Sequence, residues 1–402
     1  MAIKKSTLRC FSLGVLIAHI SFLSLSTEHV SNYSNIQLVL EALFLLIIFP
    51  YMKNVMFSLR NRNYNLLLIV FCALIVFSSY YNRSFSSSNT LYTFRYALSI
   101  FEVFLFAQYL QRTKMLKLGM QAVYYCLLFY CFLNDILMLC LPDSFSVDAT
   151  SYTSLTDSFN FFLLGNKFSV SYLHLFALVF YYAITRLTGK RNRIKLFAHI
   201  VFAMFISAYV SCTTAIIGCI LICFLWWREK FFVRLLSKPS FSLISIAIAD
   251  SMLIVNSAIV TLPPVRYFVE NVLKESIDLT GRIVAYSKLI PMISQSPWVG
   301  FGYENNYYIS LEYLSIGNAQ NGIMDCICSF GIVGTIVLIL LVFLSIKKGN
   351  VERSYGFYTL LFVFIVLSAV ETTMNLKFMS TLAFLAFAWD LEGFERAEQS
   401  AV

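Results

Sequence analysis

The sequence predicts a polytopic α-helical membrane protein with about twelve transmembrane helices. One observation is composition: the 402-residue chain is 59% hydrophobic and only 13% charged, whereas soluble domains carry about 25% charged residues. A second is the number of apolar runs close to the ~20 residues that a helix needs to cross a bilayer. A third is the recurrence of Lys and Arg in the short segments between alternate runs, as in cytoplasmic loops of membrane proteins.

The chain divides into twelve predicted spans. The apolar stretch from 195 to 227 is split at Ser211–Thr214, because one helix of that length would be ~50 Å long and would exceed the hydrocarbon thickness. The predicted spans are residues 8–25, 36–52, 64–81, 91–110, 118–141, 169–185, 195–210, 213–227, 241–261, 322–346, 355–371 and 377–390.

The basic residues predict the orientation of these spans. When the spans are counted from a cytoplasmic N-terminus, every inner segment is short and basic, and these segments hold most of the 30 Lys and Arg residues. The positive-inside rule places such segments in the cytoplasm. We therefore expect both termini to be cytoplasmic. The net charge of +9 then follows from topology, and no nucleic-acid partner is predicted.

We expect residues 1–402 to form a single integral membrane domain. Two outer connections are long, about 142–168 and about 262–321, and the second is the only long polar passage of the chain. The sequence has no internal repeat of the kind that marks many transporters. The polar passage of residues 262–321 is therefore the first place to search for chemistry.

No cofactor and no metal are predicted. The four histidines occur singly, and the ten cysteines form no Cys-x-x-Cys pair, so zinc-type spacing is missing. There is also no Walker loop for nucleotide phosphates and no Asp-x-Asp pair that could hold a nucleotide-sugar through a metal. Any phosphate chemistry is expected to depend on arginines at the outer face.

Arg282 is the main cation of the polar passage. It follows Thr280-Gly281 and precedes an apolar stretch that suggests a short helix. An arginine near a helix start offers fixed donors for phosphate oxygens, supplemented by free backbone N–H groups; an ordinary surface arginine is the alternative. Trp298, together with nearby tyrosines, could stack on sugar rings or belong to the interfacial aromatic belt.

The end of the polar passage carries amides and a carboxylate. Asn321 and Asp325 are four residues apart, so they share one helix face, and Gln320 lies beside them. A carboxylate one turn inside a bilayer should be paired or face a water-filled cavity. Alternatively, Gln320 and Asn321 only cap the span. Glu304 is a further carboxylate within the passage.

Several ionisable residues lie inside predicted spans. Arg95, Ser99 and Glu102 stand at i, i+4 and i+7 and form one polar stripe. Such residues are functional candidates or partners in interhelical ion pairs. Lys167 begins the span after the other long outer segment, where it could contact phosphate or snorkel to the interface. The remaining intramembrane carboxylates are Glu41, Asp135 and Asp250.

These segments resemble the O-antigen ligase and polymerase (Wzy-type) superfamily. The resemblance covers roughly residues 160–345 and the twelve-span layout. Ligase-like members carry a histidine before the asparagine, where this chain has Gln320, which cannot act as a general base; this difference favours a polymerase. The matching motifs are Gly165-Asn166-Lys167, the Ser/Thr-rich turn within Ser207 to Gly218, Thr280-Gly281-Arg282, Ser296-Pro297-Trp298-Val299-Gly300-Phe301-Gly302, Asn318-Ala319-Gln320-Asn321-Gly322 and Gly331-Ile332-Val333-Gly334.

The resemblance implies a glycosyltransferase of the GT-C kind in a bacterial cytoplasmic (inner) membrane. It would polymerise undecaprenyl-pyrophosphate-linked repeat units into O-antigen (lipopolysaccharide) or capsular polysaccharide at the outer face, independently of metal and nucleotide. A flippase and a chain-length regulator would be its partners. Two alternatives stay open: O-antigen ligase-type transfer to another acceptor, and a lipid-linked oligosaccharide flippase or transporter.

Roles for individual residues follow from this implied reaction. Fixed cations near the interface stabilise pyrophosphate charge as the glycosidic bond breaks, and the acceptor hydroxyl needs a base nearby. The predicted catalytic residues are Arg282 and Arg95 for the pyrophosphate and Asp325 or Glu304 for acceptor activation. The predicted substrate-binding residues are Arg266, Lys167, Lys288, Gln320, Asn321 and Trp298.

Overall fold

A computed structural model gives the fold of the chain. It describes residues 4–27, 29–56, 58, 61–84, 90–141, 147–149, 159–189, 192–260, 263, 267, 282–303, 305–315 and 317–387.

The regular secondary structure of the described residues is helical apart from two short antiparallel strands, so the predicted fold class is confirmed. Each of the twelve predicted spans contains a helix, the first of them continuing into a π-helical turn. The elements are α1 (Lys5–Ile17), η1 (Ala18–Phe22), α2 (Tyr33–Met56), α3 (Arg62–Tyr81), α4 (Thr90–Thr113), α5 (Leu116–Cys140), β1 (Val147–Ala149), β2 (Phe159–Phe161), α7 (Lys167–Thr188), α8 (Arg193–Tyr209), α9 (Thr213–Trp227), α10 (Glu229–Leu236), α11 (Pro239–Val260), α13 (Arg282–Ile293), α14 (Asn305–Leu314), α15 (Gly322–Lys348), α16 (Tyr355–Leu367) and α17 (Leu376–Phe387).

Six of the described helices are long and apolar enough to cross a membrane: α2, α3, α4, α5, α7 and α15. Helices α10 and α11 meet at an angle of 89° and together count as a seventh candidate span. Helices α9, α16 and α17 are apolar but shorter. A turn of residues 368–375 separates α16 from α17, where the Thr373 hydroxyl donates to the carbonyl of Phe364 at 2.6 Å.

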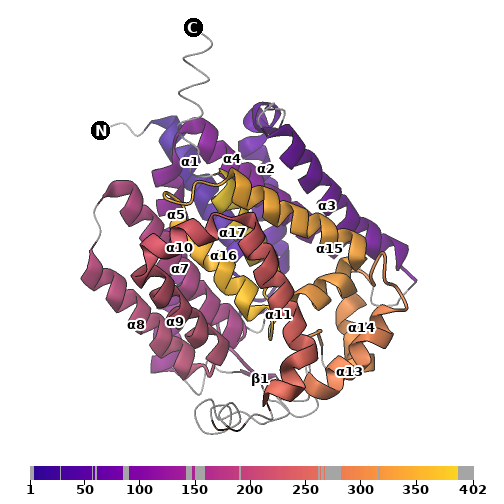
Figure 1. The fold of residues 1–402 in the computed structure, drawn as a ribbon. Helices are drawn as coiled ribbons and strands as arrows, with labels where there is room; N and C mark the ends of the chain where they lie inside the picture. The colour runs from indigo at the N-terminus through magenta and orange to yellow at the C-terminus, as the bar shows by residue number, and fades with distance from the viewer. Residues whose placement is uncertain are drawn as a thin grey trace.

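The core of the bundle is built around α17 and α16, which lie in its middle (Figure 1). Phe384 of α17 is fully buried, and its ring packs near the rings of Phe180 and Phe357, at centroid distances of 5.0 and 5.4 Å. Helix α2 instead exposes large apolar residues such as Leu46 and Phe49. Exposed apolar faces of this kind suit contact with lipid rather than water.

The polar passage lies at one end of the bundle. Helices α13 and α14 stand at the end opposite the start of α1 (Figure 1). Arg186, near the C-terminal end of α7, pairs with Glu229 of α10. Helix α10 is strongly amphipathic, as expected for a helix that lies along a membrane surface.

Candidate functional site

Helix α15 is broken near its start, and a loop of the polar passage fills the break. Gly331 has φ 70° and ψ 179° within the helix, so the helical hydrogen bonds around it are lost. The Phe301 N–H donates to the Cys328 carbonyl at 2.7 Å, and the Ile332 N–H donates to the Pro297 carbonyl at 2.8 Å. These bonds satisfy backbone groups that burial would otherwise leave unpaired.

The loop of residues 296–302 and the break in α15 at residues 331–334 meet in what we call the glycine junction. Glycine is required on both of its sides. A Cβ atom on Gly331 would lie 2.1 Å from the Trp298 carbonyl oxygen, and one on Gly300 would lie 2.5 Å from the Gly331 nitrogen. Both glycines also have positive φ angles, which other residues adopt only with strain. The motifs of residues 296–302 and 331–334, which are distant in sequence, therefore form a single structural unit.

The C-terminal end of α3 fastens this junction to the bundle. The Ser78 hydroxyl lies 2.6 Å from the Val299 carbonyl and 3.0 Å from the Ser329 carbonyl. The Asn82 side-chain amide donates to the Gly300 carbonyl at 3.0 Å. All of these side chains are buried. The junction thus has a fixed position relative to α3.

Asp325 belongs to a hydrogen-bonded network on the first turns of α15. The Asn306 amide nitrogen, from α14, lies 3.0 Å from Asp325 Oδ1 and 3.1 Å from Ser329 Oγ. The Ser310 hydroxyl in turn donates to Asn306 Oδ1 at 3.2 Å. Asn306 and Ser310 are buried, whereas Asp325 is half-buried. The network orients a partly accessible carboxylate through a buried amide.

The start of α15 is capped and tightly packed. The Asn321 side chain accepts from the Met324 N–H at 3.0 Å, which satisfies one free donor of the first turn. Gln320 precedes it with a positive φ of 50°. A Cβ on Gly322 would lie 2.7 Å from Ser368, so the cap also packs against the turn after α16. Asn321 is therefore the N-cap of α15.

Aromatic rings connect this network to α4. The rings of Tyr303 and Tyr96 stack with centroids 3.9 Å apart, and Phe330 lies parallel to Tyr303 at 6.4 Å. Tyr96 directly follows Arg95, but the two side chains face different parts of the molecule: Tyr96 packs on Tyr303 of the polar passage, whereas Arg95 pairs with Glu41 of α2.

Arg95 is held by an ion pair across to α2. Its Nε lies 3.2 Å from Glu41 Oε2, and its Nη1 donates to the Ser34 hydroxyl at 2.8 Å. The Ser99 hydroxyl donates to Glu41 at 3.3 Å. Glu102 lies next on the stripe, fully buried, and neither of its carboxyl oxygens has a partner among the described residues. The predicted stripe is therefore one polar cluster between α2 and α4.

The remaining predicted residues of the polar passage are only partly described. The backbone of Arg282 begins α13, as the sequence suggests, but its side chain lies outside the described residues, as do Arg266 and Glu304. Lys288 is exposed on α13. Trp298 is 64% exposed, although its backbone carbonyl forms part of the junction.

Lys167 occupies the first position of α7. The Asn166 side chain caps this helix by accepting from the Ser169 N–H at 3.0 Å. The Lys167 ammonium lies 5.5 Å from the ring centroid of Phe168, a distance typical of a cation–π contact. The lysine is half-buried. It lies at the N-terminal end of α7, the end at which the free backbone N–H groups of a helix point outwards.

Two residues near the site were not predicted. Asn306 orients Asp325. In the sequence, the only feature that marks Asn306 is its place in the amide pair Asn305-Asn306 of the polar passage. Glu371, in the turn after α16, is a buried carboxylate. The backbone oxygen of Glu371 lies 3.5 Å from a Cβ built on Gly322. Glu371 therefore stands beside the cap of α15.

The other intramembrane carboxylates differ in their partners. Asp135 of α5 lies 3.2 Å from His174 Nε2 of α7, which is interhelical pairing. Asp250 of α11 is half-buried, and its Oδ1 has no partner in the described part of the chain. Within that part, no group of three or more His, Cys, Asp or Glu side chains is arranged to hold a metal ion.

A segment that includes the polar passage matches the model of a known protein family. The O-antigen ligase family model (Wzy_C) matches residues 196–339. This match is consistent with the O-antigen polymerase and ligase superfamily. The matched segment runs from α8 into α15, so it includes the glycine junction, Asn321 and Asp325. It supports O-antigen-related glycan transfer, with a lipid-linked glycan as the implied substrate. No curated protein and no solved structure matches the chain.

Proposed function

We propose that the protein polymerises undecaprenyl-pyrophosphate-linked repeat units into O-antigen or capsular polysaccharide at the outer face of the cytoplasmic membrane. An acceptor-sugar hydroxyl forms a bond to the anomeric carbon of the growing glycan. The bond from that carbon to the pyrophosphate breaks, and polyprenyl pyrophosphate leaves. The observation that carries this proposal is the oriented Asp325 carboxylate within the segment matched by the family model.

Arg282 and Arg95 are assigned to the donor pyrophosphate. A guanidinium has five N–H donors, and the contacts of Arg95 to Glu41 and Ser34 occupy three of them. Among the described residues, the other two N–H groups have no partner and are assigned to phosphate oxygens. Arg282 begins α13, where free backbone N–H groups add to its charge. The additional donor contacts in this proposal are Arg266, Lys167 and Lys288.

Asp325 is assigned to the acceptor hydroxyl. Asn306 donates to Asp325 Oδ1 and so orients the carboxylate, which accepts the proton of the sugar hydroxyl as the new bond forms. Glu304 is the alternative base. Gln320 and Asn321, at the start of α15, and the exposed Trp298 are assigned to the sugars of the substrate. Gln320 replaces the histidine of ligase-like members, which favours the polymerase over the ligase.

The central test is the substitution Arg282→Ala in the native host. We expect loss of long-chain glycan with an unchanged level of membrane-inserted protein, because the charge of the departing pyrophosphate loses its stabilisation. Arg83→Ala is the matched control, since Arg83 is an exposed arginine at the end of α3. Normal polymer in Arg282→Ala cells would refute the assignment.

The ligase alternative is supported by the description of the matching family, so a second experiment separates the two reactions. In a deletion strain, a missing polymerase leaves single repeat units on the final acceptor, whereas a missing ligase leaves none. We expect single repeat units. Purified protein supplied with only the lipid-linked repeat unit should then lengthen the glycan. A transporter would show neither behaviour.

A further inference from the structure

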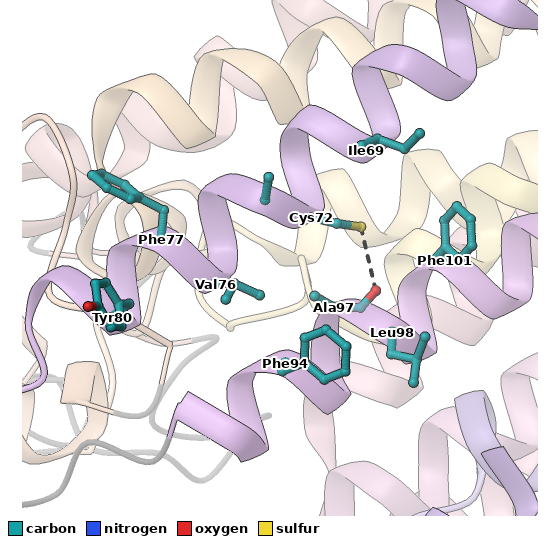
Figure 2. A pocket seen from close by; sticks show the side chains of 10 residues that line it. Ile69, Cys72, Val76, Phe77, Tyr80, Phe94, Ala97, Leu98 and Phe101 are labelled. Carbon is teal, nitrogen blue, oxygen red and sulfur yellow. Dashed lines mark hydrogen bonds between the residues drawn. The ribbon is translucent and has the colours of Figure 1, made fainter. Parts of the chain in front are cut away.

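The exposed surfaces of the bundle differ in their chemistry. The groove between α3 and α4 in Figure 2 is lined almost entirely by apolar side chains such as Phe77 and Phe94, as expected for contact with lipid tails. The exposed side of α10 instead combines two cations with an aromatic ring: Lys230, Phe231 and Arg234 are all exposed. Because hydrocarbon offers cations no partner, the exposed side of α10 requires a different occupant.

Helix α10 lies across the direction of the spans. It meets α11 at an angle of 89°, and α11 belongs to a candidate span. Helix α11 packs on α15, which is itself long and apolar enough to cross a membrane. A helix at right angles to a span runs close to the plane of the membrane surface, where an amphipathic helix is stable.

The start of α10 is fixed to three neighbouring helices. Arg186 of α7 pairs with Glu229, and the Tyr182 hydroxyl donates to the same carboxylate at 3.1 Å. Trp226, near the end of α9, stacks on Tyr182 at a centroid distance of 4.0 Å and donates to the Thr359 hydroxyl of α16 at 3.1 Å. Glu229 is therefore turned towards α7, and the exposed side of α10 keeps a fixed position.

One edge of the exposed side continues an apolar surface of α9. The ring of Phe231 lies 5.1 Å from that of Phe232, which lies 5.4 Å from that of Phe224 in α9, all between centroids. Phe224 is exposed on this apolar helix. Lys230 and Arg234 are one turn apart and follow Phe231 around the helix surface. The order from Phe224 through Phe231 to the cations matches the order from lipid tails to phosphate groups.

The corner between α9 and α10 has the same two features. Trp227 is 74% exposed, and the Arg228 guanidinium carbon lies 4.7 Å from the centroid of a Trp227 ring. A tryptophan at the end of an apolar helix is typical of the headgroup level of a bilayer. Arg228, Lys230 and Arg234 thus place three positive charges within about two helical turns, and lipid phosphates are complementary to them.

We propose that α10 binds the headgroups of anionic phospholipids, with Phe231 among the acyl chains and Arg228, Lys230 and Arg234 at the phosphates. The positive-inside rule assigns this basic segment to the cytoplasmic leaflet. The lipid site is independent of the proposed glycan transfer, which takes place at the opposite face. If the cations of α10 faced the cytosol and served topology alone, the exposed ring of Phe231 would lie in water.

The experiment measures lipid binding directly. Purified protein in phosphatidylcholine nanodiscs is titrated with a phosphatidylglycerol that carries a diazirine in its headgroup, and mass spectrometry locates the label after irradiation. We expect label on residues 228–238 that unlabelled phosphatidylglycerol displaces. The same diazirine on a phosphatidylcholine headgroup should label this segment weakly. Equal labelling by the two lipids would overturn the proposal, as would label spread evenly over all basic segments.

A matched pair of double variants tests the cations. Lys230→Gln with Arg234→Gln should raise the share of phosphatidylglycerol needed for half-maximal labelling about 25-fold, since each basic side chain near an anionic surface strengthens binding about fivefold. Lys53→Gln with Lys117→Gln removes the same charge from exposed positions in two other basic segments and should match the wild type. Equal weakening in both double variants would show that net charge alone attracts the lipid and would contradict the proposal.

A third variant tests the apolar edge. Phe231→Gln keeps all three cations but removes the ring from the acyl chains, so half-maximal labelling should need about tenfold more phosphatidylglycerol. Phe231→Leu keeps an apolar side chain and should stay close to the wild type. Because Phe231 is exposed, both variants should accumulate normally in the membrane. Unchanged labelling of Phe231→Gln would mean that the ring lies outside the bilayer, and the assignment of α10 would be wrong.

Discussion

At the scale of single residues, acceptor activation depends on how one carboxylate is held. Asp325 receives a hydrogen bond from Asn306, which is itself fixed by Ser310. The spacing of Asn321 and Asp325 predicted a shared helix face, but Asn321 is the N-cap of α15 with an extended backbone, so only Asp325 lies within the helix. Asn306 could not be predicted, because its contact with Asp325 crosses from α14 to α15 and leaves no periodic signal in either segment.

Asp325→Asn should reduce polymer formation by about 10²–10⁴-fold, the usual contribution of a general base. The amide keeps the shape of the side chain, so the protein level should be unchanged. Glu312→Gln removes an exposed carboxylate from α14 and serves as the matched control. Glu371→Gln tests the neighbouring acid. If Glu371→Gln stops polymerisation and Asp325→Asn does not, the base is Glu371 and the assignment of Asp325 is wrong.

Arg95 has a structural partner as well as a proposed ligand. Arg95→Ala leaves Glu41 as an unpaired buried charge, which costs about 3–5 kcal/mol in comparable cases, so less protein should accumulate in the membrane. The double variant Glu41→Gln, Arg95→Gln removes both charges and should restore the protein level. We expect this double variant to remain inactive in transfer. Full activity would show that Arg95 serves the fold alone.

At the scale of elements, the helices were predictable and their interruptions were not. Each predicted span contains a helix because an apolar run in a membrane has no other way to satisfy its backbone. The break at Gly331 and the 368–375 turn depend on distant partners, Trp298 in one case and the cap of α15 in the other. Helix α10 was expected to be a basic loop, since eight residues are too few for a clear period.

Gly331→Ala tests the junction. The backbone of Gly331 lies in a region that only glycine occupies readily, worth about 1–3 kcal/mol of strain for other residues, and the new Cβ would collide with the Trp298 carbonyl oxygen at 2.1 Å. The unfolding temperature in detergent should fall, and activity should be lost. Gly189→Ala is the control, because Gly189 also has positive φ but nothing within 4 Å of its Cβ position. A similar loss of stability in both variants would show that the junction itself contributes little.

At the scale of the whole molecule, the distribution of charge predicted an orientation for each span, whereas composition predicted only the class of protein. The alternation of basic segments gave a topology in which the polar passage faces away from both termini. In the fold, α13 and α14 stand opposite the start of α1 (Figure 1). The groove between α3 and α4 could not be predicted, since its lining is indistinguishable in sequence from other lipid-facing positions.

Topology can be tested with single cysteines in intact cells. Glu312 of α14 and Arg193 at the start of α8 are both exposed, and the positive-inside rule places them on opposite sides of the membrane. In a Cys140→Ser background, which removes the exposed native thiol, a membrane-impermeant maleimide should label Glu312→Cys in intact cells. Arg193→Cys should react only after the membrane is opened. The reverse pattern would put the proposed site in the cytoplasm, where an outer-leaflet lipid-linked glycan could not reach it.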